Sequence, residues 1–168
     1  MTVSNASLYA RAGKDMNNFL EVELDEVEKY IEYKDTLAPA VSSVNVGWHL
    51  VHLLKVITQA YEILESSDPA DYEGGVNLFR SGVFLSGSLP RGRGRAPKST
   101  RPIGEVAREE ILAELEAVKV AIKRMKDLPA NANFYHGALG QLDVGQTQGF
   151  LEIHTRHHLK IIQDILEE

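Results

Sequence analysis

The sequence contains no cysteine. Disulfides, thiolate metal sites and cysteine nucleophiles are therefore excluded, and histidine and carboxylate side chains remain as ligands for any metal ion. Long apolar runs are also missing, since none approaches the roughly 20 residues that span a bilayer. The first residues, MTVSNASLYARAGK, lack the apolar segment of a secretory signal. These absences predict a cytoplasmic protein that does not interact with a membrane.

The chain has fewer basic than acidic residues. The chain has 18 Lys and Arg residues against 24 Asp and Glu residues, which gives a formal net charge of −6 at pH 7. General nucleic-acid binders usually carry an excess of basic residues that neutralises phosphates. Nucleic acid is therefore an unexpected partner.

The remaining composition is that of a folded protein. The chain has 168 residues, of which 43% are hydrophobic and 25% are charged, which is typical of a globular protein and unlike the composition of a disordered one. This length is the usual size of one domain and suffices for a hydrophobic core. We predict a single domain over residues 1–168.

Apolar residues recur at helical spacing in four long segments, and no convincing strand alternation is present. We predict an all-α four-helix bundle whose long helices cover about residues 15–34, 43–65, 103–126 and 143–168. Asp15 and Asp143 are the expected N-caps, with Gln146 in the capping-box position. The insert between the second and third long helices holds a short helix in GVNLFRSGVFLSG and a loop over residues 88–102, and residues 131–142 are expected to be irregular.

Three histidines lie close together in the last predicted helix, in LEIHTRHHLKII. His154 and His158 fall on the core-facing stripe four residues apart, so both imidazoles can point to one place. His157 lies on the neighbouring edge of the helix. The alternative is a pair of hydrogen-bonded core histidines, but two neutral imidazoles buried side by side need partners, which a divalent cation would supply.

The second predicted helix offers a third imidazole in NVGWHLVHLLKVI. His49 and His52 are three residues apart, and either could face the core. Counted from the centre of the apolar stripe, His49 lies nearer to the core and His52 lies toward the edge. Periodicity therefore mildly favours His49.

The combination of GWHLVHL in the second helix with HTRHHL in the last resembles the DinB/YfiT-like superfamily of metalloenzymes. The resemblance implies a four-helix bundle in which one histidine of the second helix and a His-x-x-x-His pair of the last helix bind a divalent metal, usually zinc or nickel. By motif, it selects His52, His154 and His158 as ligands. The loop containing PRGRGRAPK is not a general feature of that family.

The resemblance also implies two kinds of reaction, metal-dependent hydrolysis and transfer or isomerisation that uses a low-molecular-weight thiol. Three imidazoles leave coordination positions open, as in catalytic zinc sites. There is no HExxH motif to supply the glutamate base of metalloproteases. A non-catalytic metal site, closed by His49 or His136, is the structural alternative, and a homodimer is expected from bundles of this kind.

Two further features have open interpretations. His136, in NFYHGALGQLD, either has a structural role in a loop or faces the mouth of the site, and Trp48 is expected to line the core or a pocket. The basic loop contains Arg91, Arg93, Arg95, Lys98 and Arg101. It either pairs with the acidic first helix, binds an anionic substrate beside the metal, or contacts nucleic acid.

Overall fold

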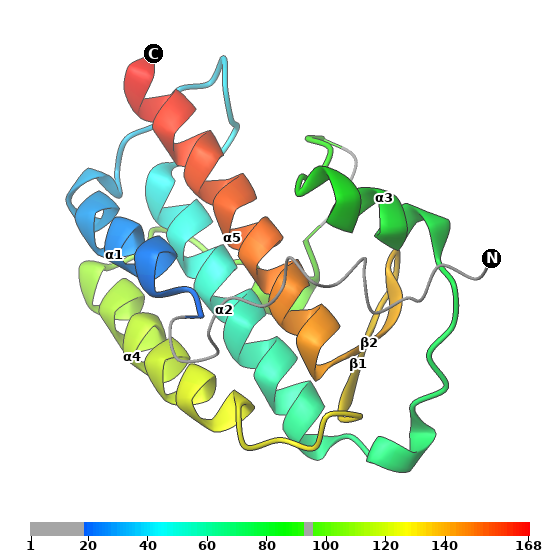
Figure 1. The fold of residues 1–168 in the computed structure, drawn as a ribbon. Helices are drawn as coiled ribbons and strands as arrows, with labels where there is room; N and C mark the ends of the chain where they lie inside the picture. The colour runs from blue at the N-terminus through cyan, green and yellow to red at the C-terminus, as the bar shows by residue number, and fades with distance from the viewer. Residues whose placement is uncertain (1–18, 93–95) are drawn as a thin grey trace.

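The structure is a computed structural model that describes residues 19–92 and 96–168 (Figure 1). The expected N-cap Asp15 lies outside the described residues. The described part is dominated by helices, with one small two-stranded sheet. The helices are α1 (Glu21–Tyr30), α2 (Val46–Ser66), α3 (Leu78–Ser86), α4 (Arg108–Met125) and α5 (Val144–Glu167), and the strands are β1 (Asn133–His136) and β2 (Gly140–Asp143). Short 3-10 turns lie at Ile31–Tyr33, Pro69–Asp71 and Lys98–Thr100.

Helix α2 is the central element of the fold. It packs against α4 on one side and α5 on another, while α1 packs against α5 (Figure 1). Its side chains are buried around most of the circumference, as the sequence predicted, and Leu50, Leu53 and Ile57 are fully buried. Each such side chain contributes about 1.5–3 kcal/mol through removal from water. None of the described helices is both long and apolar enough to cross a membrane.

Helices α1, α2 and α4 begin later than predicted, at positions set by the local backbone conformation. Helix α2 begins after Asn45, whose side-chain oxygen accepts the Trp48 N–H at 2.9 Å. Helix α4 begins five residues later than predicted, because Gly104 has a left-handed φ of 77° and the N-cap Ala107 is still extended. Ile103, taken from sequence as the first residue of this helix, is 97% exposed. Helix α1 begins after Leu20, which also has a left-handed φ of 59°.

The segment expected to be irregular forms an antiparallel hairpin, so the all-α prediction is wrong here. Strands β1 and β2 pair with Asn133 opposite Asp143 and His136 opposite Gly140. Each strand has only four residues, too few for alternation to stand out in the sequence. Arg80 of α3, 4% exposed, holds the hairpin by donating to the carbonyls of Leu139 and Gln141.

Helix α5 begins at the predicted capping box. The Asp143 carboxylate accepts the Gln146 N–H at 2.7 Å, and the Gln146 side-chain oxygen accepts the Asp143 N–H at 3.3 Å. Two N–H groups of the first turn are thereby satisfied. Because Asp143 is also the last residue of β2, this box fixes where the hairpin ends and the helix begins.

We predict that Asp143→Ala destabilises the protein by about 1 kcal/mol through loss of the cap. For a chain of this size, that lowers the Tm by roughly 2–4 °C, measurable by circular dichroism. Asp127→Ala is the matched control, since Asp127 is exposed and its side chain makes no hydrogen bond among the described residues. Equal melting temperatures for the two variants would contradict the prediction.

Candidate metal centre

The contact between α2 and α5 brings three histidines together. His52 comes from α2, and His154 and His158 come from successive turns of α5. One ligand nitrogen from each lies within 4.8 Å of the other two. The three side chains are 3%, 9% and 8% exposed, respectively. The structure thus assembles the three residues selected by motif in one buried group.

The ring positions are compatible with one shared ion. The ring centroids of the three histidines are 4.6–5.3 Å apart. Three imidazoles bound to a tetrahedral zinc at about 2.0–2.1 Å would place their ligand nitrogens about 3.3 Å apart and their ring centroids roughly 5 Å apart. The ring spacing agrees with one shared ion, and the ligand nitrogens, which lie within 4.8 Å of one another, would move closer on binding it.

His52 is oriented by a backbone carbonyl. Its Nδ1 lies 3.1 Å from the Thr100 oxygen, and a carbonyl can only accept. Nδ1 therefore carries the proton, which leaves the Nε2 lone pair for a metal ion. Metal-ligating histidines generally donate their second ring N–H in this way.

His49 contacts a candidate ligand and does not belong to the three-histidine group. Its Nδ1 lies 3.0 Å from Nδ1 of His158, and its Nε2 lies 3.0 Å from the Ser42 hydroxyl. Both ring nitrogens are thus engaged. The helical stripe placed His49 nearer to the core than His52, but the structure buries both, at 5% and 3% exposed respectively, so the stripe does not separate them.

His154 has an unsatisfied nitrogen. Its Nδ1 is buried and has no hydrogen-bond partner among the described residues, a situation that costs about 1–3 kcal/mol. Phe150 covers the ring from one side at a centroid distance of 5.5 Å. A buried imidazole nitrogen without a partner, next to two other imidazoles, is an atom that a divalent cation could satisfy.

Burial keeps these imidazoles neutral. Desolvation lowers the pKa of His154 and His158 well below the usual value, with smaller contributions from the neighbouring imidazoles. It also lowers the pKa of His52, against the opposing effect of the Thr100 carbonyl. The pKa of His49 falls to about 4, mainly by desolvation. At pH 7 the rings therefore offer lone pairs to a metal without first losing a proton.

His136 and His157 lie outside the group. The Nδ1 of His136 accepts the N–H groups of Ala138 and Leu139, both at 3.2 Å, and so stabilises the hairpin turn. Its ring packs on Phe150, which separates it from His154. His157 is half-buried at the edge of α5 and meets the ring of His158 edge-on at 5.2 Å.

Trp48 forms part of the wall of the centre. Its ring stacks on His52 at a centroid distance of 5.0 Å and an interplanar angle of 25°. Trp48 also lines a cavity of about 290 Å³, together with Asn45 and Gly104. The expectation that this tryptophan borders a pocket agrees with its position.

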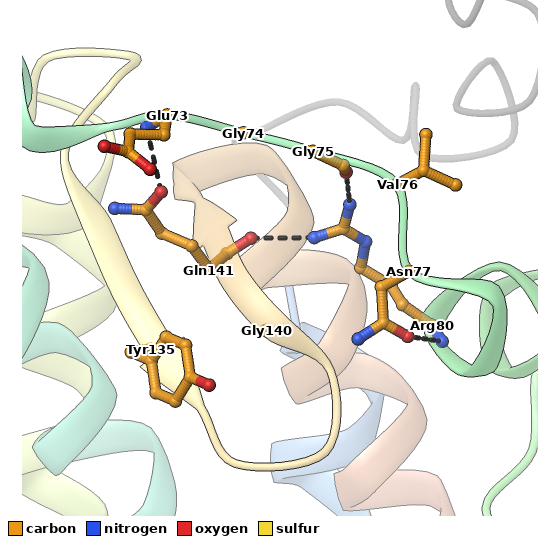
Figure 2. Close-up of a pocket in the computed structure, with 9 residues that line it drawn as sticks. All are labelled: Glu73, Gly74, Gly75, Val76, Asn77, Arg80, Tyr135, Gly140 and Gln141. Carbon is orange, nitrogen blue, oxygen red and sulfur yellow. Dashed lines mark hydrogen bonds between the residues drawn. The ribbon is translucent and has the colours of Figure 1, made fainter.

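A larger cavity, of about 380 Å³, lies beside the hairpin (Figure 2). It is bordered by the chain that leads into α3, by Tyr135 and by Arg80, whose guanidinium donates to the Gln141 and Gly75 carbonyls. None of the three grouped histidines lines either cavity. The larger cavity is therefore separate from the candidate metal centre.

Both ends of the basic loop contact the helices that carry the three grouped histidines. Arg91 donates to the Asp164 carboxylate of α5 at 2.7 Å, and Thr100 supplies the carbonyl that binds His52. Lys98 is exposed, and Arg101 donates to the Ala96 carbonyl. Arg93 and Arg95 lie outside the described residues.

Pairing between this loop and the acidic first helix is not seen among the described ion pairs. Glu23 of α1 pairs with Arg156 of α5 at 2.7 Å, and Glu28 pairs with Lys119 of α4 at 2.9 Å. The acidic face of α1 therefore binds basic residues of its neighbouring helices.

Ser42 and Thr100 were not singled out from the sequence. Thr100 acts through its backbone carbonyl, which every residue possesses, so no residue type marks it. Ser42 belongs to the break between helices, seven residues before His49.

Comparisons of the chain with models of known protein families, with curated proteins and with solved structures find no match.

The unsatisfied nitrogen of His154 generates a prediction about stability. We expect His154→Leu to raise the Tm of the metal-free protein by roughly 2–4 °C, since removal of an unsatisfied buried polar group is worth about 1 kcal/mol. His136→Leu is the control, because the same substitution there removes two hydrogen bonds and should lower the Tm. Differential scanning calorimetry in the presence of a chelator measures both, and a lower Tm for His154→Leu would refute the prediction.

Proposed function

We propose that this protein is a divalent-metal-dependent enzyme in which His52, His154 and His158 hold the metal. The observation that carries the proposal is the buried group of three imidazoles, from two helices, whose ligand nitrogens lie within 4.8 Å of one another. The group includes no carboxylate. An all-imidazole set suits zinc or nickel and is a poor site for magnesium or calcium.

An open coordination sphere favours catalysis over a purely structural site. Three protein ligands are typical of catalytic zinc, whereas structural zinc usually has four. His49 and His136, the residues that could close the sphere, are engaged with His158 and with the hairpin turn, respectively. The metal would supply Lewis acidity toward a carbonyl or phosphoryl oxygen, or affinity for a thiolate.

The proposal includes membership of the DinB/YfiT-like superfamily and its four-helix bundle, formed here by α1, α2, α4 and α5. Its support is the position of the motifs. The Trp-x-x-x-His element lies on α2, the His-x-x-x-His pair lies on α5, and these two helices pack together. Helix α3 and the basic loop are then the insert between the second and third helices of the bundle.

The reactions we propose are hydrolysis of a small molecule or transfer that uses a low-molecular-weight thiol. The chain has no cysteine, so a separate molecule must provide any thiol. The protein's own contributions are orientation of His52 by the Thr100 carbonyl and exclusion of water by Trp48 and Phe150, whose rings lie against His52 and His154.

The alternative function is a non-catalytic module that binds an anion or nucleic acid through the basic loop. Lys98 and Arg101 support it, because neither is in an ion pair with a carboxylate among the described residues. Such binding would weaken steeply as salt concentration rises. The pairing of Arg91 with Asp164 neutralises part of the loop's charge and favours the enzyme.

Metal content tests the ligand set. Protein purified without a histidine tag and offered zinc or nickel should hold about one metal per chain by plasma mass spectrometry. His52→Ala, His154→Ala and His158→Ala should each lose it, while His136→Ala, the matched control, should retain it. A metal-free wild type, or equal retention by all four variants, would sink the proposal.

Activity tests the catalytic assignment. We expect the zinc- or nickel-loaded protein to turn over a member of a panel of esters, amides and thiol-transfer substrates. Loss of a hydrogen-bond partner of a metal ligand typically lowers activity by roughly 10–100-fold. Because His52→Ala removes a ligand itself, its activity should fall by more than that. A protein that holds metal, unfolds on chelation and converts no substrate would instead have a structural metal.

A further inference from the structure

A hydrogen-bonded chain of three side chains runs from the metal centre toward the surface. Nδ1 of His158 lies 3.0 Å from Nδ1 of His49, and Nε2 of His49 lies 3.0 Å from the Ser42 hydroxyl oxygen. His158 and His49 are buried, and Ser42 is partly exposed. The rings of the two histidines are 5.2 Å apart and tilted by 44°.

One proton lies between the two facing Nδ1 atoms. The ring that carries this proton decides whether Nε2 of His158 can bind a metal. If His158 donates, its Nε2 keeps a lone pair and can bind a metal. If His49 donates, the proton of neutral His158 resides on Nε2, which then cannot ligate. The hydrogen bond therefore has one direction that is compatible with a metal held through Nε2.

We propose that His49 and Ser42 are positioning residues that hold His158 as the Nδ1–H tautomer, with Nε2 directed to the metal. This inference rests on the proposed metal site. In the chain, the N–H of His158 donates to Nδ1 of His49, and Nε2–H of His49 donates to the Ser42 hydroxyl oxygen. His49 acts through His158 and does not touch the metal.

Ser42 is itself held in place for this task. Its hydroxyl oxygen accepts the Val44 N–H at 3.2 Å, and its own N–H donates to the Ala38 carbonyl at 2.9 Å. A hydroxyl oxygen has two lone pairs, so it can accept from Val44 and His49 together. The chain thus ends on an oxygen fixed by the backbone between α1 and α2.

The proposed role resembles that of the Thr100 carbonyl at His52. Both contacts involve a ligand's Nδ1, at 3.1 Å for His52 and 3.0 Å for His158. Partners of this kind fix the ring and make the ligating nitrogen more basic, and their loss typically weakens metal binding 10–100-fold. Unlike a carbonyl, His49 can be replaced by mutagenesis, which makes its contribution measurable.

Tautomers are observed directly by nuclear magnetic resonance. In zinc-loaded protein labelled with ¹⁵N-histidine, two-bond ¹H–¹⁵N spectra should show a proton on Nδ1 of His158 and on Nε2 of His49. Ser42→Ala should shift the Nε2 resonance of His49 and leave that of His52 unchanged. A proton on Nδ1 of His49 would overturn the direction of the chain. Labelling of Ser42 by a phosphonate probe in the zinc-loaded protein would also overturn it, because a nucleophilic serine donates its proton to Nε2 of His49 instead of accepting one from it.

Cobalt binding measures the effect on the metal. Co²⁺ titrations monitored by visible absorption compare wild type with His49→Phe, His49→Gln, Ser42→Ala and the control His136→Phe, each checked for folding by circular dichroism. We expect His49→Phe to bind one Co²⁺ with 10–100-fold weaker affinity and a changed d–d spectrum. His49→Gln, whose side-chain oxygen can accept, should recover part of both, and Ser42→Ala should show a smaller loss.

The outcomes separate the two proposals. Wild-type affinity and spectrum in His49→Phe would overturn the positioning role while the metal site stands. Complete loss of Co²⁺ in folded His49→Phe, with retention in His154→Ala, would make His49 a ligand and overturn the role assigned here. A folded wild type that takes up neither cobalt nor zinc would overturn both proposals.

Discussion

The rest of the site depends on one constraint. Four buried imidazoles lie where α2 meets α5, and their ring nitrogens need hydrogen-bond or metal partners. His49 and His52 on α2 face His154 and His158 on α5, and all four are almost fully buried. An unsatisfied buried polar group costs about 1–3 kcal/mol, so each ring nitrogen needs a partner. Segments outside both helices provide two of them, Ser42 before α2 and Thr100 within the basic loop. Nδ1 of His154 is fully buried and has none among the described residues, and a cation held by the three-histidine group could supply one.

The parts of the fold that were predictable from sequence are those set by local rules. The capping box at Asp143 depends on residues three apart and was placed correctly, and the apolar circumference of α2 identified the buried central helix. The hairpin was missed because it depends on a distant residue. Its carbonyls are bound by Arg80 of α3, which the chain brings near only after folding. The late start of α4 has a local cause, the left-handed backbone at Gly104, which an apolar periodicity count does not detect.

The relation between His49 and His52 shows the limit of helical periodicity in locating a site. Residues three apart on a helix differ by about 60° around the axis, so both rings reach the face that meets α5. Their difference in role arises from what approaches from outside the helix: Thr100 toward one ring and Ser42 toward the other. A helical wheel contains neither residue. The motif points to His52, whereas the stripe ranked His49 deeper than His52 and the structure leaves them 5% and 3% exposed.

The basic insert, a departure from the pattern of the family that the sequence resembles, is structurally part of the site. Arg91 pairs with Asp164, and the Thr100 carbonyl accepts a hydrogen bond from His52. The loop is thus tied to α5 at one end and to a candidate ligand on α2 at the other. Thr100 lies in the 3-10 turn Lys98–Thr100, which packs against α2, and this packing places the carbonyl beside His52. The orientation of His52 is therefore linked to the packing of this turn on α2.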